Sequence, residues 1–121
     1  MSQTIELPPD RRLTKRTIEI GETHTYYTHF PTAPKEPVPG SLIVNEMAFL
    51  CNSMFGPGAL WQATEQLKFW RPLKIGEWVK TTITLTHFDE EKLIARLLVI
   101  LERRSNGKKV FTADYSIVLL R

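Results

Sequence analysis

One histidine of this chain stands at the start of an unusually stiff loop. Four of the nine residues at positions 31–39 are prolines: Pro31, Pro34, Pro37 and Pro39. Each proline fixes φ and removes an amide donor, so the loop can be neither a helix nor a central strand. Imidazole exchanges a proton near neutral pH, and a stiff loop would hold it in one place. His29 is therefore the first candidate for chemistry, against the alternative that it only satisfies a backbone carbonyl.

The other potentially reactive side chains have structural explanations. His24 and His87 lie in strand-like patterns, where an exposed or hydrogen-bonded histidine is the usual outcome. Cys51, the single cysteine, lies among apolar residues of a helix, which favours a small buried residue over a nucleophile. It has no disulfide partner, and no Cys/His cluster has the spacing of a zinc site. The sequence therefore predicts no metal and no cofactor.

A mostly apolar helix over residues 41–55 follows the loop directly. A single strip of its surface is polar and holds Ser41, Asn45, Glu46, Asn52 and Ser53. A helix that is apolar around most of its circumference is buried on most sides, so other elements must wrap around it. The Phe-Gly-Pro-Gly sequence at residues 55–58 ends the helix, because glycine and proline both break the helical period.

Five strands are predicted around this helix. One covers residues 16–27, before the loop, and four follow the helix at residues 60–70, 78–88, 93–101 and 111–119. Between the last two, Asn106-Gly107 is a hairpin signal, because both residues tolerate positive φ. This order predicts an α+β fold in which one long central helix is wrapped by a curled antiparallel sheet of about five strands.

Length and composition limit the class of protein. The 121 residues, 42% of them hydrophobic, suit one domain over residues 1–121, with residues 1–15 expected as a loosely ordered N-terminal segment. The net charge is +3 and the charges are interspersed, which argues against a nucleic-acid partner. No apolar run approaches the roughly 20 residues of a membrane span, and the N-terminus lacks the apolar core of a secretory signal. We therefore expect a cytoplasmic protein without a membrane span.

The loop and helix together resemble those of a known family. The order His29-Phe30-Pro31, Pro34, Pro39-Gly40, followed by an apolar helix, resembles the hotdog-fold dehydratases of the MaoC-like superfamily, which act on 3-hydroxyacyl thioesters of acyl carrier protein. In that family the loop reads Gly-His-Phe-Pro, two residues, Pro, two residues, Pro-Gly. Residues 69–79 are similar to a second segment, Phe-x-Arg-Pro-Val-x-x-Gly-Asp, which many hotdog proteins share. The resemblance runs from about Thr17 to the C-terminus and implies a long helix rolled in an antiparallel sheet.

The chain departs from the family's pattern in its loop and on its helix. Thr28 stands where the family has glycine, and the loop is two residues longer. The family's helix carries a carboxylic acid at the fifth position after the Pro-Gly glycine. Here that position is Asn45, and Glu46 is the next residue. The family's longer N-terminal segment, which helps to enclose the acyl chain, is largely absent.

The resemblance implies a mechanism with two polar groups. A histidine, here His29, withdraws the proton alpha to the thioester carbonyl, while a carboxylic acid protonates the departing beta-hydroxyl. Backbone amides at the helix start, around Gly40 and Ser41, polarise the thioester oxygen. Phe30 and Pro39 complete the implied substrate contacts. In such proteins the histidine and the acid usually come from different subunits, so the implied partner is a second copy, in a homodimer or a dimer of dimers.

The missing acid leaves three functions open. Asn45 cannot donate a proton as a carboxylic acid does, and Glu46 lies about 100° further around the helix. The leading interpretation is an enzyme similar to the 3-hydroxyacyl dehydratases of fatty acid or polyketide metabolism, with acyl-ACP or acyl-CoA as substrate. The alternatives are a thioesterase, in which Asn45 and the helix amides hold a water, and a non-catalytic acyl-binding subunit that partners an active homologue.

A group of basic residues beside the second matching segment has two interpretations. Lys68, Arg71 and Lys74 could receive the phosphate of a phosphopantetheine arm or the acidic surface of an acyl carrier protein. The alternative is an ordinary solvated face of the protein, which is the more common outcome for such a group and the one that the sequence favours.

Overall fold

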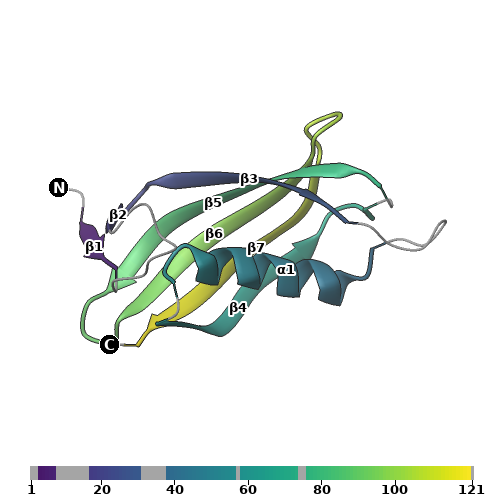
Figure 1. The fold of residues 1–121 in the computed structure, drawn as a ribbon. Coiled ribbons are helices and arrows are strands. Elements are labelled where there is room, and N and C mark those ends of the chain that lie inside the picture. Colours follow the sequence, from purple (N-terminus) through teal and green to yellow (C-terminus); the bar gives the residue numbers. More distant parts are fainter. Residues whose placement is uncertain (1–2, 8–16, 31–37, 57, 74–75, 121) are drawn as a thin grey trace.

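The computed structural model describes residues 3–7, 17–30, 38–56, 58–73 and 76–120 of the 121 residues. The elements run in the order β1 (Thr4–Glu6), β2 (Thr17–Glu19), β3 (Thr23–His29), α1 (Gly40–Ser53), β4 (Ala59–Phe69), β5 (Trp78–Asp89), β6 (Ile94–Arg103) and β7 (Lys109–Leu119). The helix lies across one face of a long, curved sheet (Figure 1). The predicted α+β arrangement of one helix and a five-stranded antiparallel sheet is confirmed.

The main sheet has the strand order β3-β5-β6-β7-β4, and every neighbouring pair is antiparallel. The chain leaves the sheet at one edge after β3, crosses its face as α1, and returns at the opposite edge as β4 (Figure 1). The hairpin predicted at Asn106-Gly107 joins β6 to β7, with Gly107 at a φ of 69° and its amide bonded to the Arg103 carbonyl. Because β3 and β4 are the two edges, each has one side that pairs with no described strand of this sheet.

The core lies between α1 and the inner face of the sheet. Strict alternation along the central strands places one apolar row per strand under the helix, as at Leu97, Val99 and Leu101 of β6. The helix contributes Ile43, Met47, Ala48 and Cys51 to this core. Each large side chain removed from water in this way stabilises the fold by about 1.5–3 kcal/mol.

A single polar contact holds the helix to β7. The hydroxyl of the fully buried Tyr115 donates a hydrogen bond to the Val44 carbonyl at 2.7 Å. Beside it lies the buried Cys51, and burial raises the pKa of its thiol well above the usual range. The thiol therefore stays protonated, which agrees with a structural role for this cysteine.

The N-terminal part differs from the expectation in two ways. The strand predicted at residues 16–27 is interrupted at Gly21, whose φ of 89° suits a turn, so β2 and β3 belong to different sheets. In addition, β1 pairs with β2 and buries Ile5 and Leu7, so residues 3–7 are an ordered part of the core. The rest of the segment expected to be loosely ordered lies outside the described residues.

The helix is less enclosed than its sequence predicts. Leu42 and Phe49 are 39% and 66% exposed, although the sequence indicated burial on most sides. They lie on the face of α1 that points away from the sheet, because the sheet covers only one side of the helix. Within the described residues, no helix is long and apolar enough to cross a membrane.

Candidate functional site

Three segments that are far apart in the sequence meet at one end of the protomer. They are the end of β3 at His29, the start of α1 at Gly40, and the connection between β4 and β5. The Val38 amide donates to the Leu73 carbonyl at 3.1 Å, which ties the residues before the helix to this connection. Figure 1 shows the helix start, the end of β3 and the β4–β5 connection gathered at this end. Most of the proline loop between them (Pro31, Pro34, Pro37) lies outside the described residues.

His29 is the last residue of β3 and is exposed. Its ring packs against that of its cross-strand partner Trp78, with centroids 5.1 Å apart and a tilt of 34°. The backbone passes close by at Gly76, where an added Cβ would lie 4.0 Å from His29 Nε2. Within the described ranges no side chain hydrogen-bonds to the ring, so the imidazole is both oriented and accessible.

The start of α1 offers unpaired amides. The amides of Leu42 and Ile43 donate to the Pro39 carbonyl at 3.1 and 3.2 Å, whereas those of Gly40 and Ser41 meet no acceptor in the described part of the chain. The N-cap residue is Pro39, which has no side-chain oxygen to satisfy them, and the first turn contains no acidic residue. No described residue compensates the helix dipole here, so this end favours a negative charge or a polarised carbonyl oxygen.

A groove of about 360 Å³ lies at the start of the helix, where Gly40 lines it. Its lining is mostly apolar and consists of Val38, Gly40, Ile43, Phe69, Trp70, Arg71, Pro72 and Leu73. At Gly40 an added Cβ would lie only 3.0 Å from Cζ of Phe69, so glycine allows the aromatic ring to rest on the helix start. A groove of this size suits a small acyl group next to the Gly40 amide.

The contact of Phe69 with the helix start is not visible in the sequence. The match at residues 69–79 pointed to this turn, but no local pattern indicates that the ring reaches Gly40 across the fold. Phe30, expected to contact substrate, is buried and does not line the groove. Of the other expected contact residues, Pro39 and Ser41 are exposed at the helix start.

Asn45 and Glu46 lie one turn further along α1, on the face that points away from the sheet. Asn45 is about 200° around the helix from the buried Ile43, and it is exposed, while Glu46 is half-buried. Neither lines the groove. A single protomer therefore brings His29 and the helix amides to one end, and does not place either polar partner in that groove.

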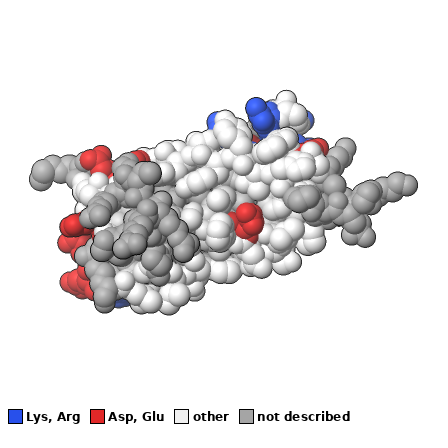
Figure 2. Space-filling model, viewed as in Figure 1, with Lys and Arg blue, Asp and Glu red and all other residues white. Residues whose placement is uncertain are grey.

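Exposed apolar side chains occur both on this outer face of α1 and on the edge strand β4. Leu42 and Phe49 of the helix are exposed, and so are Leu60, Trp61 and Leu67 on the edge strand β4. Glu46 is the only carboxylate on α1. Figure 2 shows a broad uncharged face around one acidic spot, with Lys and Arg gathered along its upper edge. Large exposed apolar surfaces of this kind mark contact sites on proteins.

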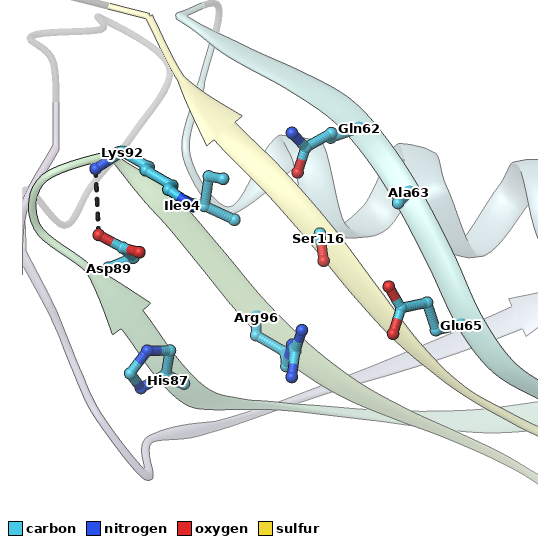
Figure 3. A pocket seen from close by; sticks show the side chains of 9 residues that line it. All are labelled: Gln62, Ala63, Glu65, His87, Asp89, Lys92, Ile94, Arg96 and Ser116. Atoms are coloured by element: carbon cyan, nitrogen blue, oxygen red, sulfur yellow. Dashed lines mark hydrogen bonds between the residues drawn. The ribbon is translucent and has the colours of Figure 1, made fainter.

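A second hollow, of about 320 Å³, lies on the opposite face of the sheet (Figure 3). Its lining is polar and includes Glu65, His87, Asp89, Lys92 and Arg96. The Asp89 carboxylate accepts the amides of Glu91 and Lys92 at 3.0 Å each, and these bonds lower its pKa. Asp89 thus holds the β5–β6 turn, and none of the expected site residues faces this hollow. Among the described residues, no group of His, Cys, Asp and Glu could hold a metal ion.

Comparison with known proteins identifies the architecture. No protein-family model and no curated protein match the chain. Among solved structures, an (R)-hydratase from A. caviae involved in PHA biosynthesis is similar, with a TM-score of 0.72, 19% identity, and coverage of 84% of this chain and 97% of that chain. A hot-dog-like protein from Thermanaerovibrio acidaminovorans has a TM-score of 0.70 at 13% identity, with coverage of 84% and 82%. This chain has the hotdog fold.

Hydratases and thioesterases of the hotdog fold are equally similar to this chain in structure. A single-residue mutant of the fluoroacetyl-CoA-specific thioesterase FlK also has a TM-score of 0.72, at 15% identity, with coverage of 88% of this chain and 90% of that chain. At such identities the likeness concerns the fold alone. The choice of reaction for this hotdog protein must therefore come from its own side chains.

Proposed function

We propose that this hotdog protein is an enzyme acting on acyl thioesters, with the thioester carbonyl bound at the start of α1. The observation that carries the proposal is the pair of amides at Gly40 and Ser41, which meet no acceptor among the described residues. They stand beside an apolar groove that Gly40 lines, at the same end of the protomer as the end of β3. Amides that already point at a site stabilise an oxyanion without rearrangement, and such stabilisation often lowers the barrier more than any other effect in the site. The leading reaction is dehydration of a 3-hydroxyacyl thioester.

His29 acts as the base in this proposal. Its imidazole accepts the proton alpha to the carbonyl, and the electron pair of the C–H bond forms the new carbon–carbon double bond. The beta C–OH bond breaks, and the hydroxyl leaves as water after taking a proton from an acid. During this step negative charge develops on the thioester oxygen, where the Gly40 and Ser41 amides stabilise it.

We infer that the second polar group comes from a second copy of the chain. Asn45 and Glu46 lie on the face of α1 that points away from the sheet, and β4 has one edge that pairs with no described strand. Covering that face with a second protomer would bury Leu42 and Phe49 and bring these polar residues to an interface. A homodimer therefore accounts both for the exposed apolar surface and for the incomplete groove.

The identity of the proton donor separates the two candidate reactions. Dehydration needs an acid, and Glu46 is the only carboxylate that α1 supplies. Hydrolysis needs only an oriented water, which an asparagine amide can hold. The presence of Asn45 on the exposed face is the observation that favours a thioesterase as the second candidate.

The experiment is incubation of the purified protein with 3-hydroxyacyl thioesters of several chain lengths, while enoyl absorbance and free thiol are followed together. Enoyl product identifies dehydration, and thiol release identifies hydrolysis. His29→Ala should abolish turnover, whereas His87→Ala, an exposed histidine on the other face of the sheet, should not. Full turnover by His29→Ala would refute the proposed base. Asn45→Asp should increase dehydration if only the acid has been lost, and no gain would point to Glu46.

A further inference from the structure

A basic cluster surrounds one indole ring at the mouth of the groove. The Lys68 ammonium lies 3.7 Å from the ring centroid of Trp70, and the Lys109 ammonium lies 5.5 Å from it. Arg71 follows Trp70 directly, and both line the groove. All four side chains are exposed. We call Lys68, Trp70, Arg71 and Lys109 the basic rim.

Hydrogen bonds to β7 hold Trp70 and Arg71 of the basic rim in place. The Trp70 indole donates to the Thr112 hydroxyl at 2.9 Å, and its backbone amide donates to the Val110 carbonyl at 2.8 Å. One guanidinium nitrogen of Arg71 donates to the Lys109 carbonyl at 2.9 Å. An arginine has five N–H donors, so most of those on Arg71 remain for a ligand. A site that is held before binding loses less entropy when the ligand arrives.

The positive charge of the basic rim is not neutralised by the described residues. Glu102 stands opposite Lys109 in the β6–β7 register, yet it forms no ion pair with it within 4.0 Å. Glu77 is the partner of Arg103, at 3.1 Å, and none of the ion pairs among described residues includes Lys68, Arg71 or Lys109. Contact with an aromatic face leaves the lysine N–H groups open to an anion. Three cations therefore converge on one exposed surface beside the groove.

We propose that the basic rim binds a phosphate ester of the pantetheine arm that carries the acyl group. The inference rests on the proposed function, because it places the thioester at Gly40. The groove of about 360 Å³ is at the small end of ligand sites, so it holds the acyl and thioester part while the rest of the arm leaves past Trp70 and Arg71. Lys68 and Lys109 stand at the Trp70 ring, so the apolar groove borders a cationic surface, which matches an arm that ends in phosphate.

The test measures binding and needs no turnover. Binding of CoA, 4′-phosphopantetheine and pantetheine is measured by titration calorimetry at low salt for the wild type and for the double variant Lys68→Gln/Lys109→Gln. Glutamine keeps most of each side-chain stem and removes the charge. We expect the Kd for CoA to rise about tenfold, since each exposed charge contact contributes a factor of roughly three. The affinity for pantetheine should not change. Lys92→Gln, an exposed lysine of the second hollow, is the matched control and should bind all three ligands as the wild type does.

The binding titrations test the basic rim separately from the proposed function. A loss shared by CoA and phosphopantetheine assigns the phosphate that both carry and supports the inference, whereas a loss confined to CoA assigns the phosphates of its nucleotide end and refutes it. The inference is refuted if wild-type protein does not bind CoA, if the double variant binds CoA as tightly as the wild type, or if pantetheine binding falls equally. Turnover of an acyl-pantetheine thioester, which has no phosphate, tests the proposed function independently.

Discussion

Gly40 and Phe69 give the sharpest test of the groove. In Gly40→Ala the new methyl group would lie 3.0, 3.2 and 3.6 Å from three carbons of the Phe69 ring. Overpacking of a core costs about 1–3 kcal/mol, and the ring is 49% exposed and can shift, so the low end of that range applies. Alanine in place of glycine in a helix returns about 0.5 kcal/mol or more. Gly40→Ala should therefore lower the free energy of unfolding by only about 0.5 kcal/mol.

The same substitution should have the opposite sign when the ring is absent. In a Phe69→Ala background the methyl group meets no ring, so Gly40→Ala should stabilise the protein by about 0.5 kcal/mol. The two residues would then show a coupling free energy of about 1 kcal/mol in a double-mutant cycle, measured by urea unfolding. Equal effects of Gly40→Ala in both backgrounds would refute the contact between the ring and the helix start.

Gly40→Ala also tests the proposed position of the thioester. The ring that the methyl displaces lines the groove, so in Gly40→Ala it would move toward the space next to the helix amides. Loss of one oxyanion donor costs a factor of about 10²–10³ in rate. We expect kcat/KM of Gly40→Ala to fall by at least tenfold while the protein remains folded. Unchanged turnover would show that the thioester does not bind at this end of α1.

Three further predictions concern the assembly and the core. Phe49→Asp places a charge on the exposed apolar face, so light scattering should show a monomer, and this monomer should have no turnover. The free energy of unfolding of the protomer should change by less than about 0.5 kcal/mol, because the site is exposed. An active dimer would contradict the proposed interface. Burial raises the pKa values of Cys51 and Tyr115 above their ordinary 9.0 and 10.0, so their contribution to stability is complete below about pH 9 and is lost as the pH rises. The melting temperature should fall from about pH 9 upward, and less steeply in Cys51→Ala. The Cys51 thiol should also resist aromatic disulfide reagents until the protein unfolds, and rapid labelling of the native protein would contradict its burial.

Much of the secondary structure could be predicted because its signals are local. Alternation along residues 93–101 and 111–119 indicated the two central strands that the structure contains as β6 and β7. Asn106-Gly107 indicated the turn between them, since the tolerance for positive φ belongs to those residues themselves. The interruption at Gly21 was missed, because a single glycine within a run of β-formers does not by itself indicate a turn.

The candidate site was predictable only in part. The loop and helix pattern singled out His29 and Gly40, and the structure places both at one end of the protomer. The contacts of Phe69 with Gly40 and of Arg71 with the Lys109 carbonyl were not predicted. They join residues about 30 to 40 positions apart, and such pairs depend on the curvature and register of the whole sheet.

By itself, the sequence determined the order of the helix and the five main strands, the apolar faces of the central strands and the presence of one histidine before an apolar helix. These properties follow from residue type and spacing, which act over a few positions of the chain. Only the tertiary structure decided that the outer face of α1 stays open, with Asn45 and Glu46 on it, and that the basic rim lies beside the groove. Burial of a helix face depends on what lies against it, and in this protomer the sheet covers one side of α1.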